Sequence, residues 1–300
     1  MGIFSVFVNV IAPVFALVAI GYLVGPRLGL EPRTLTRYAY YLLVPAFVFN
    51  VMSTAQIEVG LAARMLLYML AVVVASGLLG YGVARIMRRP PATAGAFVLI
   101  AVFGNVGNFG LPLVEFRFGP EALAPATFYF LVISMAAFAI GVAAANWVKG
   151  GSLTAALAVA KTPALLALPP ALLVNWLDLA PPLALTRAIA LLAAAMVPTM
   201  LITLGVQLSA AREIKLDRDV LAASAVKLLG APALALFLIR PFGLEGLARS
   251  TGIVQAAMPA AVLTSIIALE YDLLPDFVTT TVLFSTLASV VTLTVLLAVF

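Results

Sequence analysis

Ten apolar stretches fill almost the whole sequence, and each is long enough for a helix to cross a lipid bilayer. A membrane-spanning helix needs about 20 mostly apolar residues. Because the bilayer core offers no hydrogen bonds to an open sheet edge, we expect every stretch to be helical. The ten stretches cover residues 4–24, 36–53, 64–86, 94–116, 122–147, 157–177, 184–208, 219–239, 248–269 and 276–299.

The composition agrees with a chain whose solvent is lipid. Hydrophobic residues make up 64% of the sequence and charged residues 10%, whereas a soluble globular protein carries about 25% charged residues. The mean hydropathy is +1.19. The first stretch lacks the basic start and the small-residue cleavage site of a signal peptide, so we interpret it as a span. We predict an all-α, multi-pass integral membrane protein.

Two missing residue types narrow the function. The sequence has no cysteine and no histidine, which excludes Cys/His metal sites and histidine-dependent catalytic triads and dyads. No pair of carboxylates lies in the middle of an apolar stretch, so an intramembrane hydrolase would have no catalytic group. We expect neither an enzyme, nor a metal site, nor an organic cofactor.

The basic residues indicate orientation in the membrane. The net charge is +5, but Lys and Arg are spread thinly over the loops, which does not fit a nucleic-acid partner. Loops after odd-numbered stretches carry most of them, for example Arg85, Arg88 and Arg89 after the third. Because basic residues collect on the cytoplasmic side, we predict that both termini are non-cytoplasmic.

The ten stretches divide into two sets of five, residues 1–150 and 151–300. Five spans are an odd number, so the second set would be inverted relative to the first. The motif Leu-Thr-Arg begins both the second and the seventh stretch, and each contains a proline, Pro45 and Pro198. Since prolines are common in membrane helices, a chance coincidence is the alternative.

The fourth stretch contains a cluster that a regular helix tolerates poorly. Residues 103–113 read FGNVGNFGLPL, and in a helix interior Gly costs about 1 kcal/mol and Pro about 3 kcal/mol relative to Ala. We expect the chain to unwind at residues 107–110 and a second half-helix to begin near Leu111. The positive end of its dipole would suit an anion, while Asn105 and Asn108 would add neutral hydrogen-bonding groups.

The ninth stretch contains a matching break. Residues 255–261 read QAAMPAA, and paired broken helices are typical of the binding site of secondary transporters. Three glycines of the fourth stretch, spaced by three residues, would let the backbone of the ninth come close. The alternative is a helix-packing motif of small residues with a proline kink. The candidate substrate site consists of Asn105, Gly107, Asn108, Gly110, Pro112, Gln255 and Pro259.

Four other polar residues are candidate accessory groups. Lys227 lies well inside the eighth stretch, where it would neutralise a substrate carboxylate or change its protonation state, or extend its stem to the cytoplasmic surface. Asn50 would line the substrate path or bond a neighbouring helix. Tyr41 would anchor at the membrane interface or reach inward. Thr264 would offer a hydroxyl to a bound sodium ion.

The segments FGNVGNFGLPLVEFRFGPEAL and QAAMPAAVLTSIIALEYDLLPDF resemble the auxin efflux carrier family, which includes bacterial permeases and the plant PIN proteins. The similarity extends over essentially the whole chain. It implies a fold related to bile-acid/sodium symporters, with ten transmembrane helices in two inverted five-helix repeats and with helices four and nine broken and crossed. It also implies a scaffold of spans one, two, six and seven. Spans three to five and eight to ten would form a transport domain that moves in an elevator-like manner.

The resemblance further implies a secondary transporter of a small organic anion such as malonate or malate, and a homodimer. The long middle loop of plant members is absent, since residues 149–161 are short. We therefore expect a prokaryotic type in the bacterial inner (plasma) membrane. The crossover positions implied here are Asn105, Gly107, Gly110, Pro112 and Pro259, with Gln255 beside them.

The coupling ion stays open between H⁺ and Na⁺. No carboxylate lies near Pro259, unlike in the sodium-binding helix of bile-acid symporters, although carbonyls, Gln255 and Thr264 would suffice for sodium. A sodium-coupled symporter is therefore one alternative. A channel or a ligand sensor with a carrier fold is another.

Overall fold

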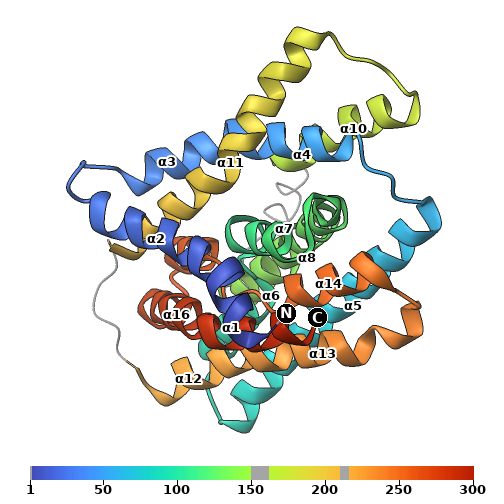
Figure 1. The fold of residues 1–300 in the computed structure, drawn as a ribbon. Helices are drawn as coiled ribbons and strands as arrows, with labels where there is room; N and C mark the ends of the chain where they lie inside the picture. The colour runs from blue at the N-terminus through green and yellow to red at the C-terminus, as the bar shows by residue number, and fades with distance from the viewer. Residues whose placement is uncertain (1, 150–161, 210–215) are drawn as a thin grey trace.

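The computed structural model describes residues 2–149, 162–209 and 216–300. These residues form helices joined by turns, and no strand occurs among them apart from one isolated bridge. Six helical segments of this part are long and apolar enough to cross a membrane, which agrees with a multi-pass membrane protein (Figure 1). They are Ile3–Val24, Val59–Ile86, Pro120–Ala137, Leu183–Ser209, Arg218–Leu238 and Pro275–Val299.

In the first half of the chain, short π-helical and 3₁₀ segments interrupt or precede several helices. The elements are α1 (Ile3–Val6), η1 (Phe7–Ile11), α2 (Ala12–Val24), α3 (Pro32–Tyr38), η2 (Ala39–Leu43), α4 (Val44–Met52), α5 (Val59–Ile86), α6 (Pro91–Val102), η3 (Val106–Gly110), α7 (Leu111–Phe118), η4 (Pro120–Ala122) and α8 (Leu123–Lys149).

In the second half, the predicted sixth stretch is described only from residue 162 onward, and its first residues lie outside the described part. The elements are α10 (Pro163–Trp176), α11 (Leu183–Ser209), α12 (Arg218–Ala225), η6 (Val226–Gly230), α13 (Ala231–Leu238), η7 (Arg240–Phe242), α14 (Gly246–Ala256), α15 (Val262–Glu270) and α16 (Pro275–Val299).

The π-helical turns of the described residues share one cause. Each of η1, η2, η3 and η6 is followed directly by an α-helix whose second residue is a proline. A proline inside a helix lacks the N–H and clashes with the carbonyl four residues earlier. Widening the preceding turn removes the clash without ending the helix. Pro198 differs, because α11 continues through it without such a turn.

The helices form two packed groups (Figure 1). In one group, α11 packs on α2 and α4, and α10 packs on α4. The contact of α11 with α2 is close because glycines meet there: a Cβ on Gly205 would lie 2.7 Å from the backbone nitrogen of Tyr22. In the other group, α5, α6 and α8 pack together, with α12 to α16 around them. Small residues are a usual means of bringing membrane helices together.

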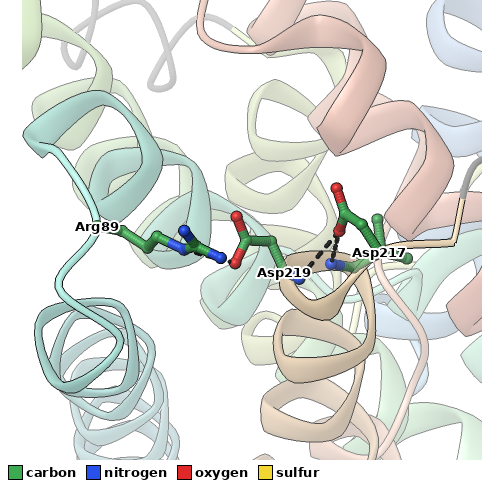
Figure 2. Close-up of polar contacts among 4 residues, drawn as sticks. Arg89, Asp217 and Asp219 are labelled. Atoms are coloured by element: carbon green, nitrogen blue, oxygen red, sulfur yellow. Dashed lines mark hydrogen bonds and ion pairs between the residues drawn. The ribbon is translucent and has the colours of Figure 1, made fainter.

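Polar contacts join loops that the predicted topology places on the same side. The guanidinium of Arg89, after α5, forms an ion pair with Asp219 at 2.8 Å, while Asp217 Oδ1 caps α12 by accepting from the N–H groups of Asp219 and Val220 (Figure 2). On the opposite predicted side, Arg64 donates to Gly243 O at 3.2 Å. These contacts hold the ends of α5 against the ends of the eighth predicted span.

Candidate functional site

The breaks of the fourth and ninth predicted spans are hydrogen-bonded to each other. The N–H of Asn105 donates to Pro259 O at 2.8 Å, and the N–H of Ala261 donates to Phe103 O at 3.0 Å. These bonds form an antiparallel bridge between Gly104 and Ala260. Backbone groups outside a helix are costly in a membrane unless they find partners. Here each break supplies partners for the other, so the two breaks stabilise each other.

The break in the fourth span begins earlier than expected. We predicted unwinding at residues 107–110, but those residues lie in the π-helical turn η3, and the unwound residues are 103–105. Asn105 O accepts from both Phe109 N–H (3.2 Å) and Gly110 N–H (3.0 Å), so the second half-helix starts at Val106 and not at Leu111. The wide turn accommodates Pro112, and the rupture occurs where the ninth span offers backbone partners.

The glycines also have roles different from those predicted. Only Gly104 meets the backbone of the ninth span, through its bridge to Ala260. A Cβ on Gly107 would lie 3.0 Å from the ring of Phe130 in α8, and a Cβ on Gly110 would collide with the side-chain oxygen of Gln255. The expectation that all three glycines admit a neighbouring backbone is therefore wrong for Gly107 and Gly110, which make room for side chains.

Two amide side chains at the crossing are buried and only partly satisfied. Gln255 Nε2 donates to Ala126 O at 3.1 Å, but its Oε1 has no partner within the described residues. Asn105 Nδ2 also lacks a partner there. An unsatisfied buried polar group costs about 1–3 kcal/mol, and in a native structure it calls for a ligand, an ion or a water. These two amides thus present one free acceptor and one free donor at the crossing.

The remaining candidates at the crossing differ in exposure. Pro259 lies in the middle of the second break, and Pro112 is the second residue of α7; both are buried. Asn108 is half-buried in η3. Thr264, in the first turn of α15, is fully buried and its hydroxyl has no partner among the described residues. The structure therefore brings these four residues to the crossing or next to it.

The other three accessory candidates, Lys227, Tyr41 and Asn50, lie in three different environments. Lys227 does not extend to the surface: it is 3% exposed, and its Nζ donates to Ala101 O, at the end of α6, at 3.2 Å. Tyr41 is 61% exposed and stacks edge-on against Tyr40, so it does not reach the crossing. Asn50 is half-buried at the end of α4 and lines two large cavities instead of the crossing.

Both cavities lie along the loop after α4: the larger is enclosed by α4, α10 and α11 of the first group, and the smaller lies between that loop and the second group. One has a volume of about 910 Å³ and the other about 740 Å³, and Asn50, Thr54 and Gln56 line both. Four carboxylates belong to their walls: Glu58, Asp178, Glu121 and Glu245. Within the described part of the chain, no lysine or arginine lines either cavity. An acidic chamber thus extends on both sides of the loop after α4, toward α10 and α11 on one side and toward α5, α8 and α14 on the other.

Two polar residues of the site escaped the sequence-based prediction. Ser285 of α16 accepts a hydrogen bond from Ala260 N–H at 3.3 Å, which satisfies a backbone group of the second break. Thr127 of α8 is fully buried, with a hydroxyl that has no partner in the described residues. Ser285 belongs to a run of Ser and Thr along the last span, and that run is the signal that points to it. The sequence contains no comparable signal for Thr127.

The ends of the half-helices set the electrostatics of the crossing. The second half-helices begin at Val106 and Val262, so the positive ends of their dipoles lie at the crossing. The first half-helices end there at Val102 and Ala256 with negative ends. No group of three or more His, Cys, Asp or Glu side chains that would hold a metal ion occurs among the described residues. The polar groups found at the crossing are amides, hydroxyls, helix ends and the ammonium of Lys227.

This architecture defines a multi-pass membrane protein with a polar site where two interrupted helices cross. The sequence profile of the membrane transport protein family matches residues 6–153 and 161–297. The chain belongs to this family, and the resemblance to auxin efflux carriers is confirmed. The family is one of membrane transporters.

Two relatives are similar over nearly their full length. A protein of Rhizobium meliloti named "Putative malonate transporter" is 27% identical over 304 residues, covering 96% of this chain and 94% of its own. A protein of Methanothermobacter thermautotrophicus named "Uncharacterized transporter" is 27% identical over 286 residues, covering 93% of this chain and 94% of its own.

Proposed function

We propose that the protein is a secondary carrier that moves a small organic anion, a mono- or dicarboxylate, by alternating access. The observation that carries this proposal is the crossing itself. There, hydrogen-bonded breaks bring two unsatisfied buried amides to the middle of the helices. The free side-chain N–H of Asn105 would donate to a carboxylate, and the free side-chain oxygen of Gln255 would accept from a water or a protonated carboxyl group. Such unsatisfied groups are costly unless a substrate or an ion uses them.

The crossing suits an anion because of the helix ends. The half-helices that begin at Val106 and Val262 direct positive dipole ends toward it, and a carboxylate accepts hydrogen bonds from free N–H groups at such ends. Half-buried Asn108 lies in the first of them and adds an amide. The name of the Rhizobium meliloti relative supports malonate as the first compound to test.

The wider architecture that we propose has ten spans in two inverted repeats. In support, the helices pack as two groups whose members match spans one, two, six and seven on the one hand and the remaining spans on the other. We assign the first group as the scaffold and the second as the transport domain that moves against it. The cavity of about 740 Å³, which lies between the groups, would then belong to the access route.

We also propose the cellular setting: the bacterial inner membrane, a homodimer, and both termini on the non-cytoplasmic side. The ion pair of Arg89 with Asp219 supports the topology, because it joins two loops that basic residues assign to the cytoplasm. On this assignment the large cavities open toward the non-cytoplasmic side, since the loop after α4 lines them.

The test is malonate counterflow in proteoliposomes that contain the purified protein. Wild-type protein should take up external labelled malonate faster when unlabelled malonate is inside. Asn105→Ala and Gln255→Ala should each reduce this flux about tenfold or more. The first variant loses a donor to the carboxylate, the second loses the amide that ties the crossing to Ala126 O, and each such contact is worth about 1–3 kcal/mol. The backbone bonds of Asn105 remain in its variant, so the fold should persist.

Thr251→Ala is the matched control. Thr251 is buried on the same helix as Gln255, but its hydroxyl donates to Leu247 O of its own helix. Its flux should stay within about twofold of wild type. If Asn105→Ala and Gln255→Ala transport as well as this control, the crossing is not the substrate site. Uptake without acceleration by internal malonate would indicate a channel and not a carrier.

A further inference from the structure

Lys227 is a buried, positively charged residue for which the carrier function above has no assigned role. It lies in the π-helical turn η6 and is 3% exposed. Its Nζ donates to Ala101 O at 3.2 Å, and a Cβ on Gly104 would lie 3.2 Å from the same nitrogen. The ammonium of Lys227 therefore lies inside the break of the fourth span. The long side chain does not extend to the membrane surface, as lysines in membrane helices often do.

The hydrogen bond of Lys227 replaces one that the break removes. In a continuous helix, Ala101 O would accept from the N–H four residues later, which is that of Asn105. Asn105 N–H donates to Pro259 O instead, at 2.8 Å. The carbonyl at the end of α6 is thus left for the ammonium. A helix C-terminus carries a partial negative charge, so it stabilises a cation placed there.

The described surroundings supply no acidic partner for this ammonium. The ion pair recorded among the described residues is that of Arg89 with Asp219, at the end of the helices. The cavity beside Lys227 is lined by Ser76, Val102, Gln255 and apolar side chains. The ammonium therefore binds a backbone carbonyl oxygen, that of Ala101, and the amide of Gln255 lines the same cavity. Oxygens of these kinds are also what an alkali cation binds.

Lys227 also fills the space that a bound cation would need. The cavity next to it has a volume of about 10 Å³, which is about the minimum for a single water molecule. A sodium ion with several oxygen ligands does not fit there while the lysine side chain is present. Removal of that side chain would join this small cavity to the volume now taken by the butylammonium group.

We propose that Lys227 is a tethered cation that permanently occupies the position of a coupling metal ion at the crossing. In carriers with broken helices, unwound carbonyls and the C-terminal ends of half-helices hold the coupling cation. Here the ammonium of the chain itself holds that place beside the end of α6. The consequence is that the protein requires no Na⁺, either to hold the crossing together or to transport. The inference rests on the carrier function proposed above.

The position of Lys227 argues against direct contact with the substrate. The turn η6 packs on α5, α6 and α16, all of them inside one helix group. Lys227 lines neither of the two large cavities. Lys227 is therefore a positioning residue: it affects the geometry and electrostatics of the crossing from within one helix group, without touching the substrate.

The experiment measures thermal unfolding of purified full-length protein in detergent by intrinsic fluorescence, with 150 mM NaCl or 150 mM choline chloride. Wild-type protein should unfold at the same temperature in both salts. Lys227→Ala should unfold earlier in choline, and Na⁺ should raise its Tm by about 2 °C or more, because a ligand that binds the folded state stabilises it. Lys227→Met, which fills the space, should not respond to Na⁺.

Ser76→Ala is the control, because Ser76 lines the same small cavity but its hydroxyl donates to Val72 O of its own helix. It should behave like wild type in both salts. A wild-type Tm that rises in Na⁺ relative to choline would overturn the proposal. An equal Tm of folded Lys227→Ala in both salts would overturn it as well.

A transport measurement keeps the test decisive if Lys227→Ala does not fold. Wild-type malonate counterflow should be the same within about twofold with Na⁺ or choline on both sides, and a strict Na⁺ requirement would contradict the tethered cation. Failure of the carrier function looks different: malonate counterflow would be absent in both salts, while the unfolding temperatures would still report on Lys227.

Discussion

At the scale of single residues, the contact between Gly110 and Gln255 holds the two broken helices in register. The side-chain oxygen of Gln255 occupies the place that a Cβ on Gly110 would take, and its amide nitrogen is tied to Ala126 O of α8. Three predicted spans meet at this one side chain. The absence of a side chain at position 110 is therefore a packing requirement.

Gly110→Ala should consequently destabilise the protein. The added methyl group displaces Gln255 and weakens its bond to Ala126, and forcing extra atoms into a packed core typically costs about 1–3 kcal/mol. We expect a lower Tm in detergent and a loss of malonate counterflow. Gly82→Ala is the matched substitution, since a Cβ there meets nothing within 4 Å, and alanine favours the helix. A Gly110→Ala variant as stable as Gly82→Ala would show that Gln255 is not held in place.

At the scale of elements, the interruptions of the fourth span have two separate causes. The π-helical turn η3 accommodates Pro112, as similar turns do before other prolines. The unwound residues 103–105 are held by bonds to Pro259 and Ala261. Pro112 and the unwound residues 103–105 are thus close in the sequence but have different structural roles.

Pro112→Ala should therefore leave the crossing intact. The bonds that define the break do not involve Pro112, so malonate counterflow should stay within about threefold of wild type, while Asn105→Ala loses about tenfold or more. Thermal unfolding should show a stability equal to or above that of wild type, because alanine restores a backbone donor to the helix. A loss of flux as large as that of Asn105→Ala would assign the rupture to Pro112.

At the scale of the whole molecule, an acidic chamber follows the loop after α4 and lies partly between the two helix groups. Glu58 and Asp178 line one cavity, and Glu121 and Glu245 line the other. A chamber of negative charge lowers the local concentration of an anionic substrate. Binding of the anion must then come from the helix ends and amides of the crossing, which lie deeper than the chamber.

Salt should consequently improve the access of malonate from this side. Raising the ionic strength from about 0.01 to about 0.15 M shortens the Debye length from about 30 to about 8 Å, so the apparent KM for malonate should fall. The double variant Glu58→Gln with Glu245→Gln should have a lower KM at low salt and a weaker salt dependence. Glu31→Gln, exposed and outside both cavities, is the control. A KM that rises with salt in wild type would contradict the repulsive chamber.

The chemistry of the individual stretches could be predicted from the sequence. Apolar runs of sufficient length require helices in lipid, so the all-α class and the positions of most helices follow from local composition. The interruptions at the fourth and ninth stretches also follow, because Gly, Pro and Asn lower helix stability locally whatever surrounds them. Asn105, Gln255 and Pro259 could be chosen as candidate site residues from the sequence because they lie in or beside these local interruptions.

The hydrogen-bond and packing partners of these residues come from segments far away in the sequence. Only the tertiary structure therefore identifies them. The break lies at residues 103–105 because Pro259 and Ala261 face it, and Gly107 is needed because Phe130 of another helix lies against it. Lys227 is buried because the fourth span breaks and frees Ala101 O. The local sequence determines which backbone conformations have a low free energy. Long-range packing selects among these conformations and determines which polar atoms remain without a hydrogen-bond partner.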